Sequence, residues 1–141
     1  GKNPLFLGIL NGSFLFAADL FRLIEGNAEI SFLKMASYQG TATTGKINEL
    51  IGINEDITNR HVIILEDIVD TGITLEKIIS DLNTKNPASI AIATLLFKPA
   101  AYQKSIPVNY IGMKVANDFL VGYGLDYDGL GRNLKEIYKL K

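Results

Sequence analysis

The architecture of this chain follows from residues 61–75, whose sequence is HVIILEDIVDTGITL. The first five residues are an almost continuous apolar run, which is typical of a strand buried on both faces of a parallel sheet. Three acids interspersed with turn residues come next, followed by apolar residues at helical spacing: Leu75, Ile78, Ile79 and Leu82. The segment therefore predicts a buried strand, an acidic turn and a helix.

Further apolar runs on both sides of this segment predict more strands and another helix. Strands are expected at residues 5–10, 30–36, 90–97 and 108–115, with short β segments at 119–123 and 136–140, and a helix at 14–24. Strands that alternate with helices in this way are typical of an α/β domain with a mainly parallel central sheet flanked by helices.

The composition is that of one folded domain. The 141 residues are 48% hydrophobic and 21% charged, and the net charge of −1 argues against an extended basic surface for nucleic acid. The chain has no cysteine, which excludes thiol catalysis and thiolate metal sites. No apolar run approaches the ~20 residues that a bilayer-spanning helix needs. We therefore expect a single cytoplasmic domain that covers residues 1–141.

A polar segment rich in threonine and glycine interrupts the pattern between residues 37 and 52. Such a long polar excursion in a compact domain favours a functional lid over a plain connector, the alternative being a surface hairpin with no role. We expect a flexible lid loop at about residues 37–53.

The acidic turn combines the groups that a sugar phosphate requires. Ligands of open α/β sheets bind beyond the carboxyl ends of the strands, where Glu66, Asp67 and Asp70 are expected. Buried carboxylates there need a balancing Mg²⁺ or ligand hydroxyl groups. The following turn, Thr71 to Thr74, enters a helix, whose free N–H groups favour a phosphate. The alternative is that Asp67, Asp70 or a threonine only caps the helix, but one residue is enough for that.

Residues 65–75 resemble the phosphoribosyl-pyrophosphate motif of the type I phosphoribosyltransferases. Further segments are similar to the hypoxanthine–guanine branch in the same order along the chain, and together they span nearly all of it: Gly12-Ser13-Phe14, Ser37-Tyr38, Lys98-Pro99, residues 118–127 and Arg132. The resemblance implies the fold of that family, with a small C-terminal hood at about residues 116–141.

The resemblance also implies a role for each matching residue. Glu66 and Asp67 would hold the ribose hydroxyls or Mg²⁺, with Asp126 as a further metal ligand. Asp70 would be the catalytic general base or acid at purine N7. The remaining roles are a 5′-phosphate cradle at Asp70, Thr71, Gly72, Ile73 and Thr74, purine contacts from Ile68, Lys98, Phe119 and Leu120, pyrophosphate contacts from Asn11, Gly12 and Arg132, and a lid led by Ser37 and Tyr38.

The reaction implied is a purine-salvage transfer. With Mg²⁺, phosphoribosyl pyrophosphate and hypoxanthine, or guanine, would give IMP or GMP and pyrophosphate, and relatives of this kind are dimers or tetramers. A lysine donor at position 98 suits a 6-oxo group better than the amino group of adenine. The alternatives are a sister enzyme of other base preference and a non-catalytic regulator that senses phosphoribosyl pyrophosphate or nucleotides.

Two features depart from the family pattern. Asn11 stands where the family commonly has a basic residue, so only a backbone contribution to pyrophosphate binding is expected there. Family members also carry a helical segment ahead of the first strand, whereas the first predicted strand begins here at Leu5. From this we expect a trimmed or incomplete version of the domain.

Overall fold

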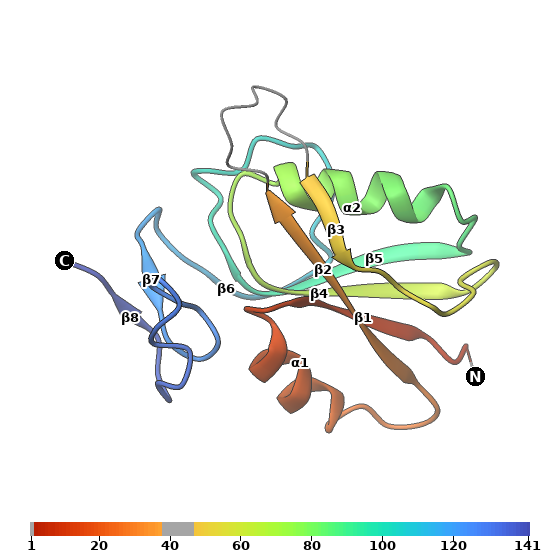
Figure 1. Cartoon of the computed structure of the whole chain (residues 1–141), viewed down its shortest axis with the longest axis horizontal. Helices are drawn as coiled ribbons and strands as arrows, with labels where there is room; N and C mark the ends of the chain where they lie inside the picture. Colours follow the sequence, from red (N-terminus) through yellow and green to blue (C-terminus); the bar gives the residue numbers. More distant parts are fainter. Residues whose placement is uncertain (1, 38–46) are drawn as a thin grey trace.

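The computed structural model describes residues 2–37 and 47–141, and a six-stranded sheet forms its centre (Figure 1). The strand order is β3-β2-β1-β4-β5-β6, and all neighbouring pairs are parallel except β2 and β3. The prediction of a mainly parallel central sheet is therefore confirmed. The strands are β1 (Leu5–Leu10), β2 (Glu29–Ser37), β3 (Ile47–Ile51), β4 (His61–Val69), β5 (Ser89–Phe97) and β6 (Tyr110–Lys114).

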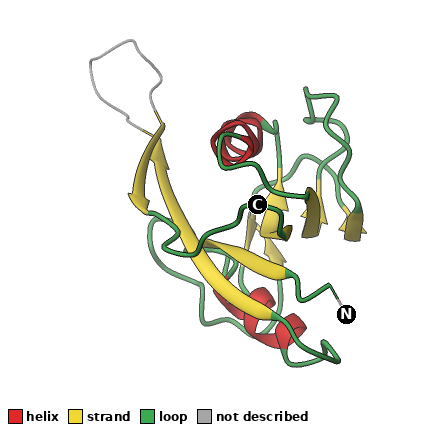
Figure 2. Cartoon of the chain, turned by 90° about the vertical axis from the view of Figure 1, so that its right-hand side faces the viewer, coloured by secondary structure: helices red, strands yellow, loops and turns green. Residues whose placement is uncertain are grey.

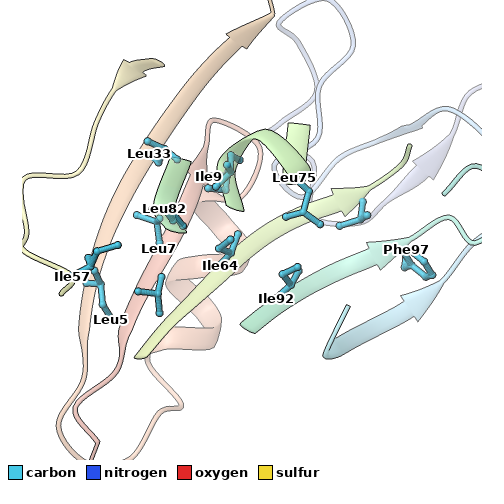
Figure 3. Packing of buried hydrophobic residues seen from close by; sticks show 13 residues of the cluster. Leu5, Leu7, Ile9, Leu33, Ile57, Ile64, Leu75, Leu82, Ile92 and Phe97 are labelled. Atoms are coloured by element: carbon cyan, nitrogen blue, oxygen red, sulfur yellow. The ribbon is translucent and has the colours of Figure 1, made fainter. Parts of the chain in front are cut away.

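Two helices, α1 (Phe14–Phe21) and α2 (Ile73–Asn83), cover opposite faces of the sheet (Figure 1). Side chains alternate between the faces along a strand, so Ile64 joins the larger core under α2 whereas Leu65 joins the smaller core against α1. Figure 3 shows the larger core. The buried residues of α2 in this core are Leu75, Ile78 and Leu82, as the helical spacing predicted.

Helix α1 is shorter than the predicted range of residues 14–24. Its chain continues through Leu23 and Ile24, whose N–H groups bond the carbonyls of Leu20 and Phe21 three residues earlier. Such i→i−3 bonds tighten the end of a helix into a turn. The apolar pattern therefore runs past the last α-helical residue. None of the helices among the described residues is both long and apolar enough to cross a membrane.

The direction of the sheet reverses between β1 and β4. From β1 the chain moves outward to β2 and β3, and from β4 it moves in the opposite direction to β5 and β6. The loops that follow β1 and β4 consequently flank a topological switch point, where open α/β sheets bind ligands. Strand β4 also continues further than predicted, because pairing with β5 extends through Glu66, Ile68 and Val69.

A two-stranded antiparallel sheet of β7 (Leu120–Val121) and β8 (Tyr138–Lys139) stands beyond the carboxyl ends of the central strands (Figure 1). At one edge of the central sheet, β2 and β3 pair in antiparallel fashion (Figure 2). Strand β3 lies within residues 37–53, all of which were expected to form a lid loop, because Ile47–Ile51 finds hydrogen-bond partners in β2. Ser37 is the last residue of β2, whereas Tyr38 lies outside the described residues.

Candidate active site

A cavity of about 230 Å³ lies at the carboxyl end of β4. Strand β4 and the turn into α2 supply most of its lining, and β1 and β2 supply the rest through Ile9, Leu10 and Met35. Of the residues singled out in the sequence, the cavity brings together Glu66, Ile68, Asp70, Thr71, Gly72, Ile73 and Thr74. The acidic turn is therefore one concave site.

The turn from Asp70 to Thr74 leaves the start of α2 free for an anion. Gly72 occupies the N-cap position with a φ of 90° and no side-chain capping bond. The Thr71 hydroxyl accepts the Ile73 N–H at 3.4 Å, whereas the Asp67 carboxylate bonds the N–H of Ile68 within β4. The acids thus do not cap this helix, and the N-terminal N–H groups of α2 favour a phosphate in the cavity.

Lys98 follows the end of β5 and, without lining the cavity itself, meets Asp70, one of the residues that do. Its side chain is only 8% exposed, and its Nζ lies 3.3 Å from Oδ2 of the half-exposed Asp70. The backbone of Lys98 is held as well, since its N–H donates to the Val69 carbonyl at 3.0 Å. A solvated turn lysine would not be buried in this way. The pair therefore places a fixed cationic donor beside a carboxylate at the rim of the cavity.

The Asp67 carboxylate faces away from the cavity lining, toward the loop after β1. Consecutive strand residues point to opposite faces, so Asp67 and Glu66 lie on opposite sides of β4. A Cβ at Gly12 would lie 2.0 Å from Oδ2 of Asp67, so any other residue there would displace the Asp67 carboxylate. The loop after β1 and the second acid of β4 are consequently in direct contact.

The hood brings Asp126 and Arg132 to the side of β4 that Asp67 faces. Their side chains form an ion pair at 3.5 Å, and Nη1 of Arg132 donates to the Gly124 carbonyl at 2.6 Å. Gly124 in turn packs on the first loop, because a Cβ there would lie 2.4 Å from the Gly12 carbonyl. The hydroxyl of Tyr123 also donates to Asp19 of α1. These contacts fix the hood against the loop after β1.

Burial raises the pKa of both acids of β4. For Glu66 the pKa lies well above its ordinary value, mainly through desolvation and further through the charge of Asp67. Desolvation raises the pKa of Asp67 to about 6, against the lowering effects of the Ile68 N–H and of Arg132. Two desolvated carboxylates in adjacent positions favour a cation or hydroxyl donors as their partner.

The ligand-free protein should lose stability as the pH rises from 4 to 7. The raised pKa of Asp67 means that the folded state binds this proton more tightly than the unfolded state does. The stability that the bound proton adds is therefore fully present below about pH 4 and is lost as the pH rises through about 6. The free energy of unfolding of Asp67→Asn minus that of the wild type should therefore increase by on the order of 2 kcal/mol from pH 4 to pH 7. Urea unfolding of both proteins at each pH measures this increase. A pH-independent difference would contradict it.

The remaining predicted residues lie outside the cavity lining. Phe119 is 55% exposed, and its ring meets that of Tyr127 edge-on at 5.8 Å, so it is not a core aromatic. Leu120 follows in β7, and Asn11 follows β1 through a cis peptide bond. Within residues 2–37 and 47–141, no three acidic or histidine side chains form a ready-made metal cluster. Glu66, Asp67 and Asp126 are thus not gathered at one point.

Comparison with known proteins agrees with this geometry. The family model for the phosphoribosyl transferase domain matches residues 1–128. The hypoxanthine phosphoribosyltransferase of Haemophilus influenzae is 42% identical, over 98% of this chain and 78% of the relative. The hypoxanthine-guanine phosphoribosyltransferase of Streptococcus pneumoniae is 44% identical, over 100% of this chain and 79% of the relative. The chain belongs to the phosphoribosyltransferase family.

The solved structures of this family extend the likeness to the fold. The crystal structure of a hypoxanthine phosphoribosyltransferase from Staphylococcus aureus has a TM-score of 0.93 and 41% identity, and it covers 100% of this chain and 77% of that one. The hypoxanthine-guanine phosphoribosyltransferase structure from Bacillus anthracis also has a TM-score of 0.93, at 37% identity, with 100% and 84% covered. The expected type I phosphoribosyltransferase fold is therefore confirmed.

Several residues of this phosphoribosyltransferase site were missed at the sequence level. Ile9, Leu10 and Met35 line the cavity, but in the sequence they are ordinary members of apolar runs. Tyr102 and Lys104 pack on Gly72 from the loop after β5. No local pattern singles out such residues, because pairing between distant strands creates their contacts with the site.

Proposed function

We propose that this chain is a Mg²⁺-dependent hypoxanthine(-guanine) phosphoribosyltransferase of purine salvage. It transfers the 5-phosphoribosyl group from phosphoribosyl pyrophosphate to hypoxanthine or guanine, giving IMP or GMP and pyrophosphate. The observation that carries the proposal is the buried Lys98 beside Asp70, at the rim of a cavity that ends in the free N-terminus of α2. The Lys98–Asp70 pair suits a 6-oxopurine, and the N-terminus of α2 suits a sugar phosphate.

The sugar phosphate is held by β4 and the turn after it. The N–H groups and hydroxyls from Asp70 to Thr74 bind the 5′-phosphate at the positive end of α2. Glu66 and Asp67 bind the ribose hydroxyls, directly or through the metal. The buried position of Glu66 supports this role, because ligand hydroxyls would replace the water that its carboxylate has lost.

The purine is recognised by groups from β4, β5 and the hood. Lys98 donates from Nζ to the 6-oxo group, which rejects adenine because two donors would then face each other. Phe119 stacks on the base, and its exposed ring supports that role. Ile68 and Leu120 contact the ring edges. Asp70 removes the proton from N7 while N9 attacks the anomeric carbon and pyrophosphate departs.

The pyrophosphate is bound on the opposite side of β4 by Asn11, Gly12 and Arg132. Mg²⁺ fits this site, because it usually takes one or two carboxylates together with substrate oxygens rather than a complete protein cage. The carboxylates proposed to hold it are Glu66, Asp67 and Asp126, and because Glu66 and Asp67 point to opposite sides of β4, a single ion would take its protein ligands from one side only. The bound ion would neutralise the charge of the leaving pyrophosphate. Ser37 and Tyr38 lead the lid that excludes water during the transfer.

The regulator alternative is not favoured. The proposed catalytic acid, Asp70, is present, and relatives that match 98% or more of this chain are named as transferases. We further propose that the enzyme works in the cytoplasm as a homo-oligomer, a dimer or a tetramer, and has no nucleic-acid partner.

A panel of bases tests the proposed function. The protein is incubated with phosphoribosyl pyrophosphate, Mg²⁺ and hypoxanthine, guanine, xanthine or adenine, and nucleotide formation is followed by ultraviolet absorbance. We expect turnover with hypoxanthine and guanine, no turnover with adenine, and loss of all activity in EDTA with recovery on adding Mg²⁺. Binding of phosphoribosyl pyrophosphate without turnover of any purine would instead identify a non-catalytic regulator.

A further inference from the structure

The loop after β5, residues 98–106, supports the phosphate turn from outside the cavity. The Gln103 N–H donates to the Thr71 carbonyl at 3.0 Å. A Cβ at Gly72 would lie 2.5 Å from the Tyr102 ring and 2.8 Å from Cγ of Lys104. Tyr102 and Lys104 thus cover the Cβ side of Gly72, and neither residue lines the cavity. The turn lies between this loop and the site.

The bond from Gln103 sets the direction of a donor in the phosphate turn. The carbonyl of one residue and the N–H of the next point in opposite directions across a trans peptide. Because the Thr71 carbonyl points to Gln103, the Gly72 N–H points away from the loop, on the cavity side of the turn. A phosphate at the N-terminus of α2 would accept this N–H.

Tyr102 anchors the loop in the core. Its ring packs edge-on against Phe97 of β5 at a centroid distance of 5.2 Å, and its hydroxyl donates to the Ile106 carbonyl at 2.6 Å. The loop also begins at Lys98, whose carbonyl accepts the Tyr102 N–H at 3.2 Å. The residue that touches the phosphate turn is therefore bonded to the residue that meets Asp70.

We propose that Tyr102 is a positioning residue for both halves of the substrate. Its ring holds Gly72 in place beneath the 5′-phosphate, and its backbone holds Lys98 beneath the purine. It touches neither ligand. This inference rests on the proposed function, since it assigns a support to the same site.

Steady-state kinetics of two substitutions test this role. Tyr102→Leu removes the ring contact at Gly72, and Tyr102→Phe keeps it while losing the hydroxyl bond. We expect Tyr102→Leu to raise the KM for phosphoribosyl pyrophosphate about tenfold and the KM for hypoxanthine severalfold, because misplaced groups bind more weakly. Tyr102→Phe should stay within about twofold of the wild type. The KM for pyrophosphate in the reverse reaction should not change, because its site lies across β4.

A matched variant separates positioning from general stability. Ile57 is 1% exposed and packs beside Leu5, at the opposite end of β1 from the site (Figure 3). Ile57→Ala should lower the thermal midpoint as Tyr102→Leu does, but should leave every KM unchanged. Equal KM changes in both variants would overturn the proposal, because the effect would then be one of stability alone.

The backbone bond gives a second test that does not depend on the Tyr102 ring. Gln103 is exposed, so Gln103→Ala should have no effect, whereas Gln103→Pro deletes the N–H that orients the Gly72 donor. We expect Gln103→Pro to raise the KM for phosphoribosyl pyrophosphate. A wild-type KM for phosphoribosyl pyrophosphate in Tyr102→Leu overturns the inference, whatever Gln103→Pro shows, but leaves the proposed function intact. Absence of turnover in the wild-type enzyme would instead refute the proposed function.

Discussion

Replacing Asp70 by asparagine is expected to lower kcat by roughly 10²–10⁴-fold, the range that a positioned proton acceptor contributes. The substitution keeps the shape of the side chain and an oxygen that can accept from Lys98, now 3.3 Å from Asp70. It removes the ability to take the N7 proton and the negative charge that faces Lys98. The KM for phosphoribosyl pyrophosphate should therefore change little. Steady-state measurements at saturating hypoxanthine, with the concentration of phosphoribosyl pyrophosphate varied, determine both quantities.

The control for this substitution is an acid-to-amide change outside the site. Asp81 of α2 pairs with Lys77 at 2.9 Å on the exposed face of the helix. Asp81→Asn makes the same acid-to-amide change near the other end of α2 but should leave kcat unchanged, since exposed pairs contribute little. Equal kcat values for Asp70→Asn and the wild type would show that Asp70 is not the proton acceptor.

Replacing Gly124 by alanine should cost both stability and activity. Its φ of 97° is one that alanine adopts only with strain, and the added Cβ would lie 2.4 Å from the Gly12 carbonyl. A backbone atom cannot move aside as a flexible side chain can. The hood must therefore shift away from the loop after β1, carrying Arg132 with it. We expect a loss of about 2 kcal/mol or more and a decrease in kcat/KM of about 10²-fold.

Gly129 in the same hood provides the matched control. Its φ of 82° imposes a similar backbone strain on alanine, but a Cβ there would meet nothing within 4 Å. The difference between Gly124→Ala and Gly129→Ala isolates the contact between the hood and the first loop. Urea unfolding and pyrophosphate-dependent reverse kinetics measure the two effects. Similar behaviour of the two variants would mean that this contact contributes neither to stability nor to catalysis.

Most of the fold was predictable because its signals are local. Apolar runs of strand length marked β1, β2, β4 and β5, and a helical stripe identified the three buried residues of α2. The observed ends of strands and helices differ from the predicted ones. Strand β4 continues past Leu65 because β5 supplies hydrogen-bond partners to Val69, and the pattern of a single segment carries no information about its neighbour.

In the candidate site, too, the sequence predicted some features, and only the structure revealed others. Glu66, Asp70 and the turn to Thr74 are consecutive in the sequence, and they do line one cavity. The burial of Lys98 was not predictable, because before a proline it resembles a solvated turn residue. The opposite directions of Glu66 and Asp67 follow from strand alternation once β4 is known to include both residues.

By itself, the sequence determined the α/β class, the expectation of a mainly parallel sheet and the acidic turn, because each was inferred from apolar runs, helical spacing or a motif within single segments of the chain. The tertiary structure alone decided which distant residues complete the site. Gly12 against Asp67, Gly124 against Gly12, and Tyr102 against Gly72 are all close approaches across the switch point or between loops. They arise from the packing of separate elements at the carboxyl ends of the strands, and packing of this kind leaves no periodic signal in a sequence.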